Sequence, residues 1–121
     1  MTQGLVDTLL HLVNIESVSA NEEELTDWFA REMATAGLPA VERARDWALF
    51  GGPGSGKPVV LLAGHSDTVP AQGNLPGHLD GEWVCGLGAS DMKAGLAVML
   101  ELARWLRAGE HELAVEPRFL L

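Results

Sequence analysis

The chain has 121 residues, of which 47% are hydrophobic, and a formal net charge of −9. This length and composition allow one buried core, so we expect one domain or part of one, and the acidic balance argues against a nucleic-acid partner. No apolar run approaches the roughly 20 residues that cross a bilayer, the N-terminus lacks a signal-peptide pattern, and the lone cysteine forms no internal disulfide. These features predict a cytoplasmic protein with no membrane partner.

Two amphipathic helices are predicted in the first third of the chain. Leucines at helical spacing indicate the first helix over residues 4 to 15, and His11 inside it is interpreted as an ordinary helix residue because no second ligand accompanies it. Ser19 with Glu22, and Asn21 with Glu24, both fit the capping-box pattern at the start of the second helix. That helix is expected to end at Gly37, a residue type that readily adopts the left-handed conformation.

A glycine-rich stretch at residues 51 to 57 follows two short extended segments. Gly51, Gly56 and Lys57 satisfy most of the phosphate-loop pattern, which would make the chain a nucleotide binder. However, Pro58 stands where that pattern needs Ser or Thr to bind magnesium, and an apolar run follows where a helix is needed. We interpret the stretch as a glycine-rich hairpin and keep nucleotide binding as an alternative.

The apolar run over residues 59 to 63 is predicted to be a strand buried on both faces inside a parallel sheet, because it is short, apolar and β-branched at its start. Pro70 lies beyond it and has no N–H for a sheet ladder. His65 and Asp67 come at the carboxyl end of this strand, where open α/β sheets place their ligand sites. This end of the strand is therefore the first candidate site.

Turn-forming residues dominate the stretch from 71 to 82, which we interpret as a loop with a solvated His78. A short strand is expected at residues 83 to 85. Cys85 is interpreted as a packing residue, because no neighbouring feature would lower the pKa of its thiol.

Asp91 follows two glycines and precedes a helical pattern that we expect to run from about residue 92 to 107. On this pattern alone Asp91 is an N-cap of the helix, since Asp is a favoured capping residue. The last apolar segment, residues 113 to 121, is interrupted by Pro117, so a strand is expected only after that proline.

His65, Asp67 and Asp91 have the chemistry of a metal site, because imidazole and carboxylate are ligands of zinc and related divalent ions. Two residues apart in an extended segment, His65 and Asp67 point the same way. Asp67 can therefore accept a hydrogen bond from one ring nitrogen while the other binds metal. Asp91 could bridge two ions through its two oxygens. A histidine at a strand end beside unrelated acidic residues remains the alternative on spacing alone.

The chain resembles the di-zinc amidohydrolase and peptidase family that contains aminoacylase, carboxypeptidase G, acetylornithine deacetylase and succinyl-diaminopimelate desuccinylase. Two motifs carry the resemblance: Gly64-His65-Ser66-Asp67-Thr68-Val69-Pro70 and Gly86-x-Gly88-x-Ser90-Asp91-Met92-Lys93-x-Gly95. The resemblance extends over nearly the whole chain, and residues 71 to 76 look most like the desuccinylase branch.

This resemblance implies an α/β fold in which a mixed, mostly parallel sheet is flanked by helices. It implies two divalent metal ions, zinc or cobalt, with His65 binding one ion, Asp91 bridging both, and Asp67 as a catalytic residue that orients His65. The Asp91–Met92 peptide bond is typically cis in the family. The implied reaction is hydrolysis of the N-acyl amide bond of a small amino-acid derivative. N-succinyl-LL-2,6-diaminopimelate is the favoured substrate, and another amidohydrolase or peptidase activity of the family is the alternative.

Residues 1–121 are expected to be the N-terminal portion of a metal-dependent catalytic domain. Relatives supply the general base and further ligands after this point, from a Glu-Glu pair and later residues, and commonly dimerise through a separate lid domain. Glu110, Glu112 and Glu116 do not form such a pair and are not assigned to the site. We therefore expect a homodimer at full length, and a 121-residue chain that alone is inactive and binds metal weakly. A metal-free, non-catalytic fragment of the same fold is the alternative from another functional class.

Overall fold

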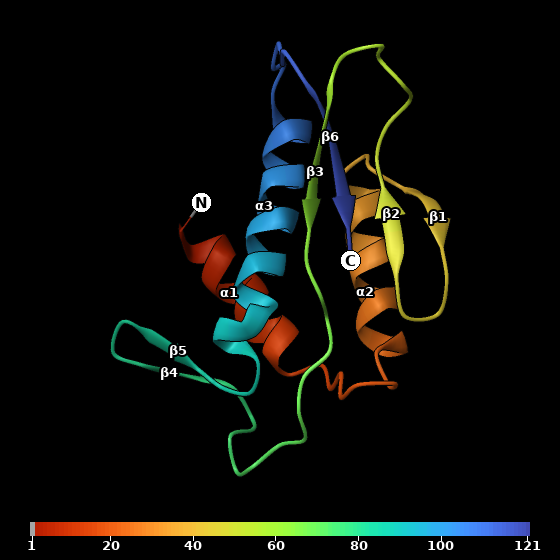
Figure 1. Cartoon of the computed structure of the whole chain (residues 1–121). Helices are drawn as coiled ribbons and strands as arrows, with labels where there is room; N and C mark the ends of the chain where they lie inside the picture. The colour runs from red at the N-terminus through yellow and green to blue at the C-terminus, as the bar shows by residue number, and fades with distance from the viewer. Residues whose placement is uncertain (1) are drawn as a thin grey trace.

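The computed structural model describes residues 2–121 and has an α/β architecture (Figure 1). Its elements follow in the order α1 (Thr2–Val13), α2 (Glu23–Thr35), β1 (Ala40–Arg43), β2 (Ala48–Phe50), β3 (Val59–Ala63), β4 (His78–Asp80), β5 (Trp83–Cys85), a kinked turn (Ala89–Lys93), α3 (Ala94–Ala108) and β6 (Glu116–Leu120). No helix within residues 2–121 has both the length and the hydropathy needed to cross a membrane.

The larger sheet has the strand order β1-β2-β6-β3. It is mixed, as expected, but only β3 and β6 are parallel, whereas β2 is antiparallel to both β1 and β6. The predicted mostly parallel sheet is therefore not found in this part of the fold. The short connection between β1 and β2 permits only an antiparallel pair, because a parallel pair needs a crossover of a dozen or more residues.

The burial predicted for β3 is wrong. The strand lies at the edge of the sheet, with β6 as its partner, and Val59, Val60 and Leu61 are 58%, 45% and 50% exposed. Leu62 alone packs against the core. An apolar run indicates that burial is favourable. Burial also depends on how many other elements pack against the strand, and the residues of the run itself do not reveal that number.

The glycine-rich stretch is not a hairpin either. It connects β2 to β3, and β6 lies between these two strands, so the stretch crosses over the end of β6. Glu116 holds it there by accepting hydrogen bonds from the backbone N–H of Ser55 at 2.6 Å and from its hydroxyl at 2.8 Å. As the sequence indicated, the stretch opens a strand and not a helix, which leaves the phosphate-loop interpretation without its structural requirement.

Strand β6 begins earlier than predicted, at Glu116, and includes Pro117. The N–H of Glu116 donates to the carbonyl of Pro58, and that of Leu121 donates to Ala48 on the opposite side. By this alternation the position of the missing N–H of Pro117 faces the β2 side, where β2 pairs only with Phe119 and Leu120. The proline therefore costs the ladder no hydrogen bond.

The three helices pack with the sheet around one core. Helix α3 contacts both α1 and α2, and α2 contacts β1 and β2. In the view of Figure 1, α2 lies behind β6 and β2, and α3 and α1 lie to the left of β3. The largest fully buried apolar side chains come from the three helices and from β2 and β6: Phe29, Phe50, Phe119, Leu12, Leu25, Met33, Leu96 and Leu100. This packing fixes the carboxyl end of β3 relative to the start of α3.

The ends of α2 were predicted with mixed success. Gly37 has φ +81°, the left-handed conformation expected after the helix. The capping box is wrong, because no side chain caps the first turn of α2. Ser19 instead donates its hydroxyl to Asp67, 48 positions away in the sequence, and Glu22 accepts a hydrogen bond from the N–H of Ala20.

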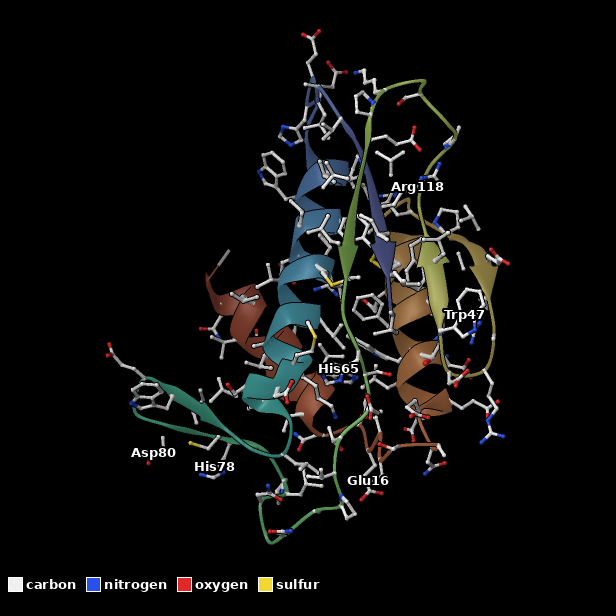
Figure 2. The ribbon with its side chains drawn as sticks, viewed as in Figure 1. Glu16, Trp47, His65, His78, Asp80 and Arg118 are labelled. Carbon is white, nitrogen blue, oxygen red and sulfur yellow. The ribbon has the colours of Figure 1, made fainter. Side chains whose placement is uncertain are left out.

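Strands β4 and β5 form a separate antiparallel hairpin that projects from the body of the fold (Figure 1). His78 is exposed on β4 and lies away from His65 in Figure 2, in agreement with its interpretation as a solvated residue. Cys85 is half-buried on β5.

Candidate metal centre

His65 and Asp91 lie in different loops and meet at the carboxyl end of β3. The Nε2 atom of His65 is 3.0 Å from Oδ1 of Asp91, although the residues are 26 positions apart in the sequence. His65 follows the last residues of β3, at the end of that strand in Figure 2. Asp91 lies in the turn that leads into α3. The two loops that the sequence singled out therefore bring an imidazole and a carboxylate into contact.

Close backbone packing makes this meeting possible. The N–H of His65 points at the sulfur of Met92, 3.3 Å away. Gly88, with φ +71°, lies so close to the first loop that a Cβ atom there would be 2.6 Å from Cγ2 of Thr68. A side chain at Gly88 would both strain the backbone and push the loops apart.

The other ring nitrogen of His65 faces Asp67. Nδ1 is 3.1 Å from Oδ1 of Asp67 and 3.2 Å from its backbone oxygen. Both of these atoms are acceptors, so Nδ1 carries a proton and Nε2 is the nitrogen that can present a lone pair to a metal ion. This is the arrangement expected of a histidine ligand with a carboxylate behind it.

The charges around His65 favour its protonated form when no metal competes. Desolvation lowers the pKa of His65, but the hydrogen bonds to Asp91 and to Asp67 and the charges of both carboxylates outweigh it, so the pKa lies above its ordinary value of 6.5. A metal ion at Nε2 would therefore have to displace a proton, which makes binding dependent on pH. The hydroxyl of Ser19 is the largest cause that lowers the pKa of Asp67 and keeps this residue a carboxylate.

A cavity of about 400 Å³ opens beside these side chains. Its lining comes from three segments of the chain and includes Ser19, His65, Asp67, Ser90 and Asp91. The side chain of Asp91 is 88% exposed and that of His65 48% exposed. The donor atoms therefore face an open space that can admit a metal ion, further ligands and a substrate.

Asp91 is not the N-cap that its sequence position suggested. Its φ and ψ of −126° and 94° are not helical, the peptide bond to Met92 is cis, and Lys93 is the residue that precedes α3. The cis bond agrees with the resemblance described above. The carboxylate of Asp91 points to His65 and caps no backbone N–H.

Lys93 contributes to the site in a way that the sequence did not reveal. It is 1% exposed, and its Nζ donates to the backbone oxygen of Ile15 at 2.7 Å. Burial lowers its pKa to about 8. The hydrogen bond ties the Asp91 turn to the chain just after α1. The one signal in the sequence was a lysine directly before the apolar first half of α3.

The His and Glu residues that the sequence analysis did not assign to the site lie outside the cavity. His11 packs on Trp28, and Glu116 pairs with Arg118. Glu110 and Glu112 are exposed in the segment before β6. Within residues 2–121, no three His, Cys, Asp or Glu side chains are grouped so that they could hold a metal ion.

The pair formed by His65 and Asp91 nevertheless fits a divalent metal ion. His65 offers an imidazole nitrogen, and Asp67 orients its ring through the other nitrogen. Asp91 offers a carboxylate with two oxygens. This donor set suits zinc and related divalent metal ions. A complete centre needs at least one more protein ligand, so the pair fits as a part of a site.

Comparisons with known proteins support the resemblance. Residues 61–120 match Peptidase family M20/M25/M40. Succinyl-diaminopimelate desuccinylase of Corynebacterium glutamicum is 38% identical over 91 residues, which are 74% of this chain and 25% of that protein. The chain thus spans about a quarter of the length of this curated relative.

Solved structures share the fold. A tripeptidase from Staphylococcus aureus superposes on 99% of this chain with a TM-score of 0.84 and 24% identity, over 36% of its own length. The YXEP protein of Bacillus subtilis, described as a dinuclear metal binding peptidase from the M20 family, superposes on 98% of the chain and 34% of its own, with a TM-score of 0.72 and 19% identity.

Proposed function

Because the chain belongs to peptidase family M20/M25/M40, we propose that it forms part of the active site of a metal-dependent hydrolase that cleaves N-acyl amide bonds in amino-acid derivatives. One observation carries this proposal: two loops place Nε2 of His65 and Oδ1 of Asp91 3.0 Å apart beside an open cavity. A metal-free, non-catalytic role has no comparable geometric support, because it does not explain why an imidazole and a carboxylate from separate loops meet beside an open cavity.

Each of the three side chains has a distinct role in the proposal. His65 would offer Nε2 to one metal ion, and Asp91 would offer its carboxylate as a ligand shared between two ions. Asp67 holds the proton on Nδ1 of His65 and thereby fixes the tautomer and the direction of the ring. When bound, divalent metal ions at such a centre polarise the amide carbonyl and lower the pKa of water.

The substrate proposal is narrower. We propose that the acyl group is succinyl and the amine diaminopimelate, which is what the name of the relative from Corynebacterium glutamicum indicates for that protein. No residue among 2–121 is assigned to the succinyl group, so this step is supported by the sequence relationship alone. The remaining ligands and the general base are proposed to come from the other part of the catalytic domain of the full-length protein.

The experiment that tests this function uses the full-length protein loaded with zinc or cobalt. Release of succinate from N-succinyl-LL-2,6-diaminopimelate is compared with release of acetate from N-acetylornithine. We expect the succinyl substrate to be preferred and the activity to be lost in His65→Ala and Asp91→Ala. Lys57→Ala, in the glycine-rich stretch, is the control and should retain activity. Activity that survives both site substitutions would refute the proposed centre, and a preference for the acetyl substrate would refute only the choice of acyl group.

A further inference from the structure

The connection between α1 and α2 contacts both loops of the candidate centre. It runs from the end of α1 at Val13 to the start of α2 at Glu23, and the proposed function gives it no role. Within it, residues 15 to 19 make hydrogen bonds to the His65 loop and to the Asp91 turn. We call these residues the 15–19 brace.

The brace holds the His65 loop through its backbone and through a buried serine. The N–H of Thr68 donates to the oxygen of Ser17 at 2.8 Å, and the N–H of Ser19 donates to the oxygen of Thr68 at 3.1 Å. The fully buried hydroxyl of Ser17 donates to the oxygen of Ser66 at 2.6 Å. These bonds fix residues 66 to 68 on the brace.

The brace also holds the Asp91 turn. The ammonium group of Lys93, two residues after Asp91, donates to the oxygen of Ile15. Both loops of the centre are therefore hydrogen-bonded to the same five residues. The conformation of the brace thus determines the distance between His65 and Asp91.

One side chain of the brace reaches the ligand residues themselves. The hydroxyl of Ser19 donates to Oδ2 of Asp67 at 2.7 Å, while Oδ1 of the same carboxylate lies 3.1 Å from Nδ1 of His65. Ser19 also lines the cavity. A chain of contacts thus runs from Ser19 through Asp67 and His65 to Asp91.

We propose that Ser19 is a positioning residue of the metal centre: its hydroxyl holds the Asp67 carboxylate in the rotamer that orients His65. This inference rests on the proposed function, since it assumes that His65 binds metal. The carboxylate of Asp67 is 45% exposed and has no other side-chain donor besides Ser19 and His65 among residues 2–121. Without the Ser19 hydroxyl it can rotate toward water, and the imidazole loses its fixed direction.

The expected effect is that of removing an outer partner of a metal ligand. Such substitutions typically lower metal affinity or activity about 10–100-fold. The effect should appear in metal affinity, which a purely structural hydrogen bond at an exposed serine would not change. Ser19→Thr keeps the hydroxyl and should restore the affinity.

The test measures zinc affinity of the full-length protein by competition with a chelator for the wild type, Ser19→Ala, Ser19→Thr and His65→Ala. Ser55→Ala is the matched control, because Ser55 also donates its hydroxyl to a carboxylate, that of Glu116, at the other end of β3. The melting temperature of each metal-free variant is measured in parallel.

We expect about 10–100-fold weaker zinc binding for Ser19→Ala, wild-type affinity for Ser19→Thr and Ser55→Ala, and melting temperatures close to the wild type for both Ser19 variants. If zinc binding depends on His65 but Ser19→Ala equals the wild type, the role of Ser19 is wrong and the proposed function stands. If His65→Ala equals the wild type, the proposed centre itself is wrong. An equal loss in Ser55→Ala, or no recovery in Ser19→Thr, would also refute the positioning role.

Discussion

Each end of β3 adjoins a motif-like stretch in the sequence, and the two ends differ in the structure. The entry end follows the glycine-rich stretch with its near phosphate-loop pattern, and the exit end leads into His65 and Asp67. At the entry, the polar groups are satisfied within the fold: Ser55 donates to Glu116, and Nζ of Lys57 donates to the oxygen of Leu113 at 2.6 Å. At the exit, polar side chains from separate loops face a cavity.

The difference shows that a sequence motif becomes a candidate site only where polar side chains from separate loops meet in the fold. The glycine-rich stretch has suitable residues in sequence, but its partners hold it against β6 (Arg118 marks that end in Figure 2). The exit loop has fewer suitable residues, but a second loop brings Asp91 to them. Substitutions that act on one end and not on the other test this distinction.

The largest effect is expected in the strand that supports both ends. Phe119 on β6 is fully buried and is paired in register with Phe50 and Leu62. Truncation to alanine should destabilise the chain by about 3–5 kcal/mol, because it removes buried surface and leaves a cavity. Leu61→Ala, on the neighbouring strand but half exposed, should cost far less. Chemical denaturation of the 121-residue chain measures both, and equal losses would contradict the edge position of β3.

The next effect is confined to the exit. Asp67→Ala removes the acceptor that fixes Nδ1 of His65 and should weaken zinc binding by the full-length protein about 10–100-fold. Chelator competition gives the affinity. Glu116→Ala, at the entry end of β3, is the control and should leave the zinc affinity unchanged. A comparable loss of zinc affinity in that variant would show that the two ends are not independent.

A smaller effect, dependent on pH, is confined to the entry. Hydrogen bonds from the N–H and the hydroxyl of Ser55 and from Arg118 lower the pKa of Glu116 to about 2. A depressed carboxyl pKa stabilises the fold above the ordinary value near 4.5, and this contribution is lost as the pH falls from there toward 2. The stability difference between the wild type and Glu116→Gln should therefore shrink over this range.

Denaturation curves at several pH values check this behaviour. Glu112→Gln, at an exposed position before β6, is the control and should stay parallel to the wild type. A Glu116→Gln difference that is constant between pH 4.5 and 2 would contradict the assigned contacts.

The smallest effect is expected for Lys57→Ala. Its ammonium group bonds to one exposed backbone oxygen, so we expect a stability change within about 0.5 kcal/mol. ATP binding, measured by calorimetry, should be absent in both the wild type and the variant. ATP binding by the wild type that disappears in Lys57→Ala would revive the phosphate-loop interpretation.

The sequence predicted the elements better than their surroundings. Helical spacing located α1, α2 and α3, and the apolar run located β3, because these patterns depend on residues within one element. The edge position of β3 and the crossover before it could not be predicted in this way. They depend on β6, which enters the sheet more than 50 residues later in the chain.

The same limit applies to the site. His65, Asp67 and Asp91 were found because they lie in recognisable motifs at a strand end and before a helix. Ser19 and Lys93 were missed because each acts on a residue far away in the sequence: Ser19 on Asp67 and Lys93 on Ile15. A serine before a helix fits a capping pattern equally well, and only the fold decides which partner its hydroxyl meets.

The most direct test of the proposed centre is the metal content of the full-length Asp91→Ala protein after loading with zinc and removal of excess metal. If Asp91 bridges two ions beside His65, the variant should hold clearly less zinc than the wild type, which we expect to hold two equivalents. Two equivalents in Asp91→Ala, and equally in His65→Ala, would contradict the assignment of these residues as ligands.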